Sequence, residues 1–375
     1  MNNCCSVIRE MVGQGWENLT SASLFDKALY FFALLTPICF WMPWDLNMFQ
    51  KLFFIFAVFT LWGVGFLSER QREISHKFLG GIILWAVISS LTHIVLINTG
   101  SIATDYICFG ILSEGLIFIL CGCLLFYLVS VYSKNFNIAY PLLIISILNL
   151  FFAFTQKIGI NLIWSNVPTI GGLMGTQSQL TVFSAMSVPI LGHLWYPLAL
   201  IPVISMFLAY SYTGILALFL AVTFYLYRTK QIARLLSWTA VGLLFVIFNF
   251  HQLWIKLLIR LDLWWTTLKE IIHFPVFGKG FDNTFSNNMI YSNVDKGWTF
   301  RHNDYLNIAV NLGLPFLALI IIGVWKIMKK SRLNYLSVAI LTLLIASCFQ
   351  TSLYFVRIAG TGIILLALKY SESYG

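Results

Sequence analysis

The residues best suited to chemistry lie in one polar stretch, Gln252 to Pro315, of a sequence that is otherwise strongly apolar. Within it, His302 directly precedes a segment in which Asn303, Asn307 and Asn311 recur every four residues. This spacing places the three amides on one face of a helix, because the positions between them are apolar. The pattern predicts a short amphipathic helix with His302 at its start.

His302 is placed where it could act as a general base. We expect Asn303, or His302 itself, to cap the helix, with Asp304 in its first turn. A helix N-terminus presents free N–H groups and partial positive charge, which attract anions and favour a neutral imidazole. An interfacial histidine without a chemical role fits this local pattern equally well.

Arginines in and near the same stretch could bind a phosphorylated substrate. Arg260 is followed by Trp264 and Trp265 and then by the turn-forming run Gly278-Lys279-Gly280. A guanidinium offers a planar pair of donors that suits phosphate, although Arg260 and the tryptophans could instead anchor the chain at a membrane interface. Arg357 lies near the end of an apolar segment, where a charge is costly unless it is paired or faces a wet cavity.

The composition places these residues in a membrane protein. Of 375 residues, 59% are hydrophobic and 10% are charged, whereas soluble domains are about 25% charged. Topology and anionic lipid explain the net charge of +9, since no nucleic-acid motif is present. The seven cysteines show neither a disulfide framework nor metal-binding spacing. We expect one all-α membrane domain over residues 1–375.

Twelve apolar segments, several of them short, are candidates to cross a bilayer. They lie at 28–43, 52–67, 79–97, 107–132, 140–155, 180–193, 197–210, 213–227, 235–251, 313–328, 334–350 and 353–368. Lysine and arginine cluster in connections that alternate along the chain and are assigned to the cytoplasmic side, and this bias puts both termini in the cytoplasm. It puts 156–179 and 252–313 on the outer side, the second as an active-site loop with short amphipathic helices at the membrane edge.

Four blocks of this sequence together resemble the O-antigen ligase-like superfamily. The blocks are Arg260-Leu261 with Trp264, Phe274 to Gly280, His302 to Leu306, and Leu312 to Pro315. The superfamily includes O-antigen ligases, O-antigen and capsule polymerases, and bacterial protein O-oligosaccharyltransferases. Gly175 to Leu180 gives weaker support, with glutamine where the family has asparagine.

The resemblance implies a GT-C-like fold and metal-independent, inverting transfer of a glycan from undecaprenyl diphosphate. It makes His302 the base for the acceptor hydroxyl, Asn303 a residue that orients the site, and Arg260 a diphosphate contact. Further substrate-binding candidates are Arg301, Lys279 and Trp264. One departure is Tyr212, which stands where many members have arginine, and Arg357 could supply the missing charge.

We therefore predict a bacterial inner-membrane enzyme whose active site faces the periplasm. Ligation of O-antigen to the lipid A-core is the preferred function, and polymerisation onto a growing glycan is the nearest alternative. A protein acceptor comes third, and a secondary transporter is the alternative from another class. Membrane lipids are the further partners. No cofactor and no nucleic acid are expected.

Overall fold

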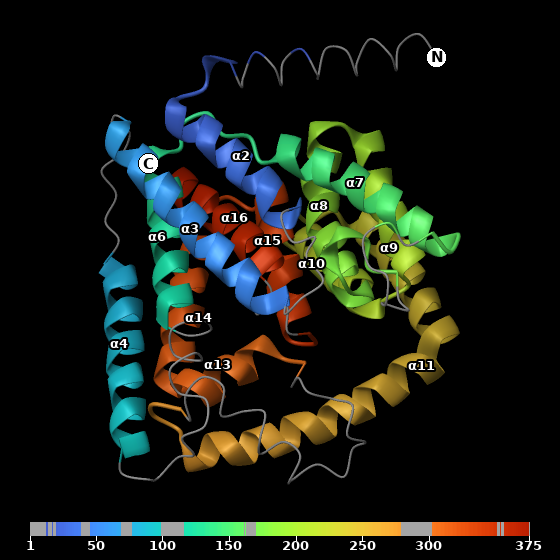
Figure 1. Ribbon diagram of the computed structural model, residues 1–375. Helices are drawn as coiled ribbons and strands as arrows, with labels where there is room; N and C mark the ends of the chain where they lie inside the picture. The colour runs from blue at the N-terminus through green and yellow to red at the C-terminus, as the bar shows by residue number, and fades with distance from the viewer. Residues whose placement is uncertain are drawn as a thin grey trace.

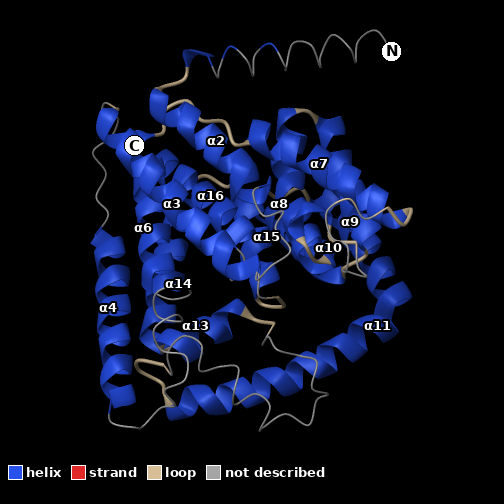
Figure 2. Cartoon of the chain, viewed as in Figure 1, coloured by secondary structure: helices blue, strands red, loops and turns tan. Residues whose placement is uncertain are grey.

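The computed structural model describes residues 20–38, 46–68, 77–98, 116–160, 170–278, 302–350 and 356–374, with positions 13, 17, 162 and 353. These residues form α-helices and two short 3-10 helices, and no strand occurs among them (Figure 2). The all-α expectation is therefore confirmed.

The helices follow one another with short connections in the described segments. Their bounds are α2 (Leu24–Ile38), α3 (Leu46–Leu67), α4 (Lys77–Asn98), α6 (Leu116–Tyr132), α7 (Ala139–Lys157), η2 (Gly172–Met174), α8 (Gln177–Leu194), η3 (Tyr196–Ala199), α9 (Leu200–Ala209), α10 (Tyr212–Arg228), α11 (Ile232–His273), α13 (Asp304–Leu312), α14 (Leu314–Lys330), α15 (Tyr335–Ser347) and α16 (Val356–Tyr374). Each apolar segment predicted from the sequence coincides, in whole or in part, with one of them.

Two of these helices, α7 and α11, are long and apolar enough to cross a membrane. Along α11, large apolar side chains are exposed, among them Leu243, Ile247, Phe248 and Phe250. A continuous apolar surface of this kind is typical of a face that lipid or a partner covers. The count of twelve membrane crossings stays a prediction.

The predicted boundary of α11 is wrong. The sequence pattern ended this span at residue 251 and began a loop there, but the helix continues without a break to His273. No glycine or proline occurs between Gly242 and Pro275, so nothing stops the helix earlier. Its last turns bury one narrow stripe, at Leu263, Thr266, Thr267, Glu270 and Ile271, and this three-and-four spacing is that of an amphipathic helix.

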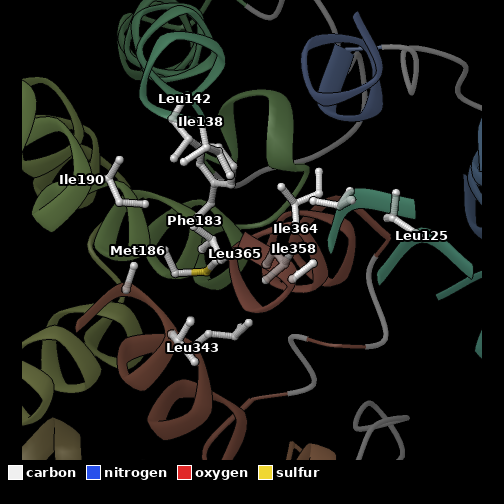
Figure 3. Close-up of a cluster of buried hydrophobic side chains, with 14 of the residues drawn as sticks. Leu125, Ile138, Leu142, Phe183, Met186, Ile190, Leu343, Ile358, Ile364 and Leu365 are labelled. Atoms are coloured by element: carbon white, nitrogen blue, oxygen red, sulfur yellow. The ribbon is translucent and has the colours of Figure 1, made fainter. Parts of the chain in front are cut away.

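The core lies where α8, α10 and α15 pack on one another, with α16 and α6 beside them (Figure 1). Phe183 and Met186 of α8 meet Leu343 of α15 there, and Ile364 and Leu365 of α16 complete the cluster (Figure 3). Burying one such side chain is worth about 1.5–3 kcal/mol. The cluster therefore fixes the helices whose ends carry the candidate site.

The start of α4 and the basic connection between α14 and α15 lie beside the C-terminal turns of α16. Phe78, at the start of α4, packs against Tyr370 with the ring centroids 5.6 Å apart. The Lys330 ammonium lies 3.5 Å from the ring centroid of Tyr374. This end carries the C-terminus at the upper side of Figure 1, whereas α13 lies at the lower side.

Candidate functional site

The start of α13 is organised as the sequence predicts. Asn303 is the N-cap, with extended backbone, and its side-chain oxygen accepts a hydrogen bond of 3.0 Å from the backbone N–H of Leu306. Asp304 is buried, and its Oδ2 accepts a 2.9 Å bond from the backbone N–H of Leu353. These bonds hold the chain around His302 against the connection between α15 and α16.

The asparagine face of α13 is half-buried. Asn303 is the cap, and Asn307 and Asn311 follow it at the predicted spacing, with the Oδ1 atom of Asn311 buried and without a hydrogen-bond partner among the described residues. The helix packs on α11 and α14, and its buried residues are Asp304, Ala309, Val310 and Leu312. The cap occupies one of the free N–H groups at the N-terminus, and an anion site there stays a prediction.

His302 joins three segments that are distant in the sequence. Its Nδ1 lies 3.1 Å from Oε1 of Gln350, in the turn after α15. Gln350 is buried, and its Nε2 donates a 2.9 Å hydrogen bond to Oγ of Ser178, in the first turn of α8. His302 has a φ of +49°, a left-handed conformation that is uncommon for residues other than glycine.

The electrostatic setting keeps His302 neutral. Burial lowers the pKa of the imidazole from its ordinary value, the hydrogen bond to Gln350 raises it, and the positive charge of Arg260 lowers it further. Burial disfavours the charged form of any group, and a nearby like charge does the same. The neutral form that the sequence predicted therefore comes mainly from burial and not from the helix N-terminus.

Arg260 and Trp264 lie one turn apart on the last part of α11. The Nε atom of Arg260 and the Nε1 atom of Trp264 are both buried and have no hydrogen-bond partner among the described residues. The Trp264 ring packs against Phe349, with the centroids 6.0 Å apart, just before Gln350. Two donors without a partner among the described residues thus lie on α11, which also carries the charge of Arg260 that acts on His302.

Tyr212 lies close to the cation Lys256. The sequence analysis had named Arg357 as the residue that could supply the charge missing at position 212. The buried ring of Tyr212 begins α10, and the Lys256 ammonium lies 4.7 Å from its centroid. Lys256 precedes Arg260 by one helical turn, and the two side chains interact electrostatically. The sequence analysis missed the pairing of Lys256 with Arg260 because it ended the helix at residue 251. The four-residue spacing of these two cations was nevertheless visible in the sequence.

Two of the sequence blocks that carry the family resemblance, residues 274–280 and 312–315, contact each other next to the site. We call this contact the brace. The backbone N–H of Leu314 donates to the carbonyl of Pro275 at 2.9 Å. Gly278 and Gly313 both have left-handed φ, and a Cβ atom on either would collide with the backbone of the other block. Only glycine fits both requirements.

Helix α4 holds the same brace from the side. Trp85 donates from Nε1 to the carbonyl of Leu312 at 3.1 Å, and Ser89 donates from Oγ to the carbonyl of Phe277 at 2.8 Å. The rings of Trp85 and Phe277 stack with centroids 5.5 Å apart. The end of α11 and the end of α13 are thereby fixed relative to each other.

Residues 197–321 match the family model described as O-antigen ligase. We name this third of the chain the O-antigen ligase-like domain, after the family model that it matches. This match confirms the resemblance to the O-antigen ligase-like superfamily and indicates a membrane glycosyltransferase of the O-antigen ligase type. No curated protein matches the chain.

The O-antigen ligase-like domain contains most of the predicted site. Tyr212, Arg260, Trp264, His302 and Asn303 all lie within the matched residues and are described. Arg301 and Lys279 lie outside the described residues, and so does the side chain of Arg357, whose backbone is in the first turn of α16. The described residues contain no group of three or more His, Cys, Asp or Glu side chains that could hold a metal ion.

Proposed function

We propose that this protein transfers a glycan from undecaprenyl diphosphate to an acceptor hydroxyl, with its active site at the periplasmic face of the inner membrane. The observation that carries the proposal is a half-buried histidine with a lowered pKa, acted on by an arginine whose buried Nε atom has no hydrogen-bond partner among the described residues, both within the matched O-antigen ligase-like domain. The donor is already activated as a diphosphate, so the reaction needs no ATP or nucleotide sugar.

In this reaction the acceptor oxygen attacks the anomeric carbon while the bond from that carbon to the diphosphate oxygen breaks. His302 takes the proton from the acceptor hydroxyl, and the diphosphate leaves with the electron pair. Direct displacement inverts the configuration at the anomeric carbon. A base works best when it is unprotonated at the operating pH, and the lowered pKa of His302 meets this requirement.

The departing diphosphate carries several negative charges and needs more than one cationic donor in a low-dielectric setting. We assign Arg260 as the main contact, because its buried Nε atom has no partner among the described residues, and leaving such a donor unsatisfied costs about 1–3 kcal/mol that a substrate oxygen would recover. Lys256 lies one turn away and is held over the face of Tyr212. It supplies the second charge at the position where many family members have arginine.

Arg357, Arg301 and Lys279 stay candidate contacts for the same diphosphate. Arg357 begins α16, and the connection just before it is tied to Asp304 by the Leu353 hydrogen bond. Trp264 offers its indole N–H and a flat ring, which suits the sugar next to the diphosphate. Asn303 acts through its cap, which orients the backbone of His302.

The contacts around His302 support a periplasmic site. Ser178, Gln350 and Arg260 come from three separate parts of the chain, and the lysine and arginine bias predicts all three on the outer side. They nevertheless converge on one histidine. The C-terminus and the basic connection between α14 and α15 lie at the end of the molecule opposite α13 (Figure 1), which agrees with a cytoplasmic C-terminus.

We keep the lipid A-core as the preferred acceptor, and the match to the family model described as O-antigen ligase supports a transferase of this general type. Gel analysis of lipopolysaccharide from a deletion strain tests this choice, with the wild-type gene and the His302→Ala gene returned as matched controls. Loss of all attached polymer supports a ligase, whereas a single attached repeat unit supports a polymerase. Unchanged lipopolysaccharide with a modified protein would point to a protein acceptor.

A further inference from the structure

A hydrogen-bonded chain leads from the glycine-rich segment before α8 to the imidazole of His302. Thr176 caps α8, accepting from the backbone N–H of Gln179 at 3.3 Å, and its hydroxyl lies 3.3 Å from that of Ser178. Gln350 then joins Ser178 to His302 through the 2.9 Å and 3.1 Å contacts described above. The matched family segment runs from residue 197 to residue 321, so Ser178 lies before it and Gln350 after it.

The direction of this chain determines where the imidazole carries its proton. Gln350 uses its NH₂ group as the donor to Ser178, so its carbonyl oxygen is the atom that faces His302. A carbonyl oxygen only accepts hydrogen bonds, and Nδ1 must therefore be the donor. In a neutral imidazole the proton on Nδ1 leaves the lone pair on Nε2.

The segment that carries Ser178 is itself held from α7. Gln156 accepts at Oε1 from the backbone N–H groups of Gly171 and Gly172, at 3.0 and 2.9 Å. Asn149 accepts at Oδ1 from the backbone N–H of Leu173 at 2.9 Å. Four side-chain to backbone anchors, counting the Thr176 cap, thus fix the start of α8. A partner held this firmly can impose one orientation on Gln350.

We propose that Gln350 and Ser178 are positioning residues that hold His302 as the tautomer protonated on Nδ1, so that Nε2 is the atom that removes the acceptor proton. The inference rests on the proposed role of His302 as the base. It gives the glycine-rich segment before α8 a function: the segment holds Ser178, which orients Gln350 and through it His302. Such outer contacts commonly fix the tautomer and orientation of a functional histidine.

The tautomer can be read without measuring activity. The full chain is labelled with ¹⁵N-histidine in detergent, and the His302 signal is identified by its loss in His302→Ala. We expect wild-type protein to show a protonated Nδ1 and an unprotonated Nε2. Ser178→Ala leaves the Gln350 amide free to rotate, and Gln350→Leu removes the acceptor, so both should give a mixture of tautomers. Gln231→Leu, at the turn between α10 and α11, is the matched control.

Kinetics supply the second readout. Gln350→Leu and Ser178→Ala should lower kcat by on the order of tenfold, with KM for the donor nearly unchanged, which is less than the ~10²–10⁴-fold cost of losing a base. Gln350→Glu places a carboxylate beside Nδ1 and favours the imidazolium. The acidic limb of the pH profile should then move to higher pH. Arg260 on α11 is the charged group that acts on His302 from a neighbouring element, and Asp304, on α13 itself, is bonded to Leu353.

A wild-type His302 protonated on Nε2 would overturn the proposal, and so would an unchanged tautomer in both Ser178→Ala and Gln350→Leu. These outcomes differ from failure of the proposed function, which would appear as normal transfer by His302→Ala. If Gln350→Glu does not fold, the tautomer measurement on Ser178→Ala decides the question, because that change removes one hydroxyl only.

Discussion

At the scale of single residues, His302 shows how burial can prepare a base. Its imidazole contacts the neutral amide of Gln350 and faces the charge of Arg260. A carboxylate would raise the pKa and favour the imidazolium. The neutral amide of Gln350 also raises this pKa, but burial and Arg260 lower it, and the net shift is downward.

We predict that His302→Ala reduces transfer by about 10²–10⁴-fold, because a base acts on the barrier and not on ground-state binding. In wild-type protein, activity should fall as pH drops through a pKa below the ordinary value of 6.5, since burial lowers that pKa. Transfer by purified protein across a pH series measures both effects. His251→Ala, at an exposed position on α11, is the control, and near-normal turnover by His302→Ala would reject the catalytic role.

The cationic pair on α11 gives a second prediction at this scale. Arg260→Lys keeps the charge but loses the planar donor pair, and donor affinity should fall by about 10–100-fold if a charged hydrogen bond of about 1.5–3 kcal/mol is lost. Lys256→Gln should also weaken donor use. Tyr212→Phe should be close to wild type, because it keeps the ring under the ammonium. Affinity for a lipid diphosphate, measured on purified variants, tests all three.

The comparison with Arg357→Lys decides which cation replaces the family arginine. If Arg357→Lys weakens donor binding while Lys256→Gln does not, the second charge comes from α16. If Tyr212→Phe is inactive while Lys256→Gln and Arg357→Lys both behave as wild type, the hydroxyl of Tyr212 is the important group and the site is organised around the Ser211–Gly214 turn.

At the scale of elements, the brace between the ends of α11 and α13 is what brings Arg260 and His302 together. At its centre backbone meets backbone, with Leu314 bonded to Pro275 and a glycine on each side. Backbone groups cannot move aside as a flexible side chain can. The spacing of these two helix ends therefore depends on the absence of two Cβ atoms.

We predict that Gly313→Ala lowers thermal stability and transfer together, because the new Cβ would meet the carbonyl of Val276 in a left-handed conformation that costs about 1–2 kcal/mol in itself. The unfolding midpoint of detergent-purified protein measures the effect. Gly63→Ala on α3 is the matched control, since a Cβ there meets no atom within 4 Å. Equal midpoints for the two variants would contradict the brace.

At the scale of the whole molecule, the two ends of the helix body differ in character. One end carries the C-terminus and the basic connection between α14 and α15, where the buried ammonium of Lys369 donates to the carbonyl of Arg332 and to the side chains of Asn334 and Glu372. The other end collects His302 and its partners. This polarity fits a protein that lies across a membrane with its chemistry on one side.

We predict that a cysteine at position 288 reacts with a membrane-impermeant reagent in intact cells, whereas cysteines at positions 230 and 330 react only after the membrane is opened. Asn288 lies outside the described residues, and Lys230 and Lys330 belong to basic connections. A variant without the native cysteines serves as the background. Labelling at 230 but not at 288 in intact cells would reverse the proposed orientation.

The sequence by itself was sufficient to predict the all-α class, the positions of the apolar helices, the cap at Asn303 and the turn at Gly278. Each of these depends on residues a few positions apart, where composition and spacing set the backbone conformation directly. The sequence blocks also predicted the O-antigen ligase-like family, because their order along the chain is itself a pattern.

Only the tertiary structure decided which side chains meet. The contact of His302 with Gln350 joins residues 48 positions apart, and that of Gln350 with Ser178 joins residues 172 apart. The pairing of Lys256 with Tyr212 likewise required knowing that α11 continues past residue 251 and runs back along α10. Such contacts depend on how buried helix faces pack, and no local spacing in the chain records which face of one helix will meet another.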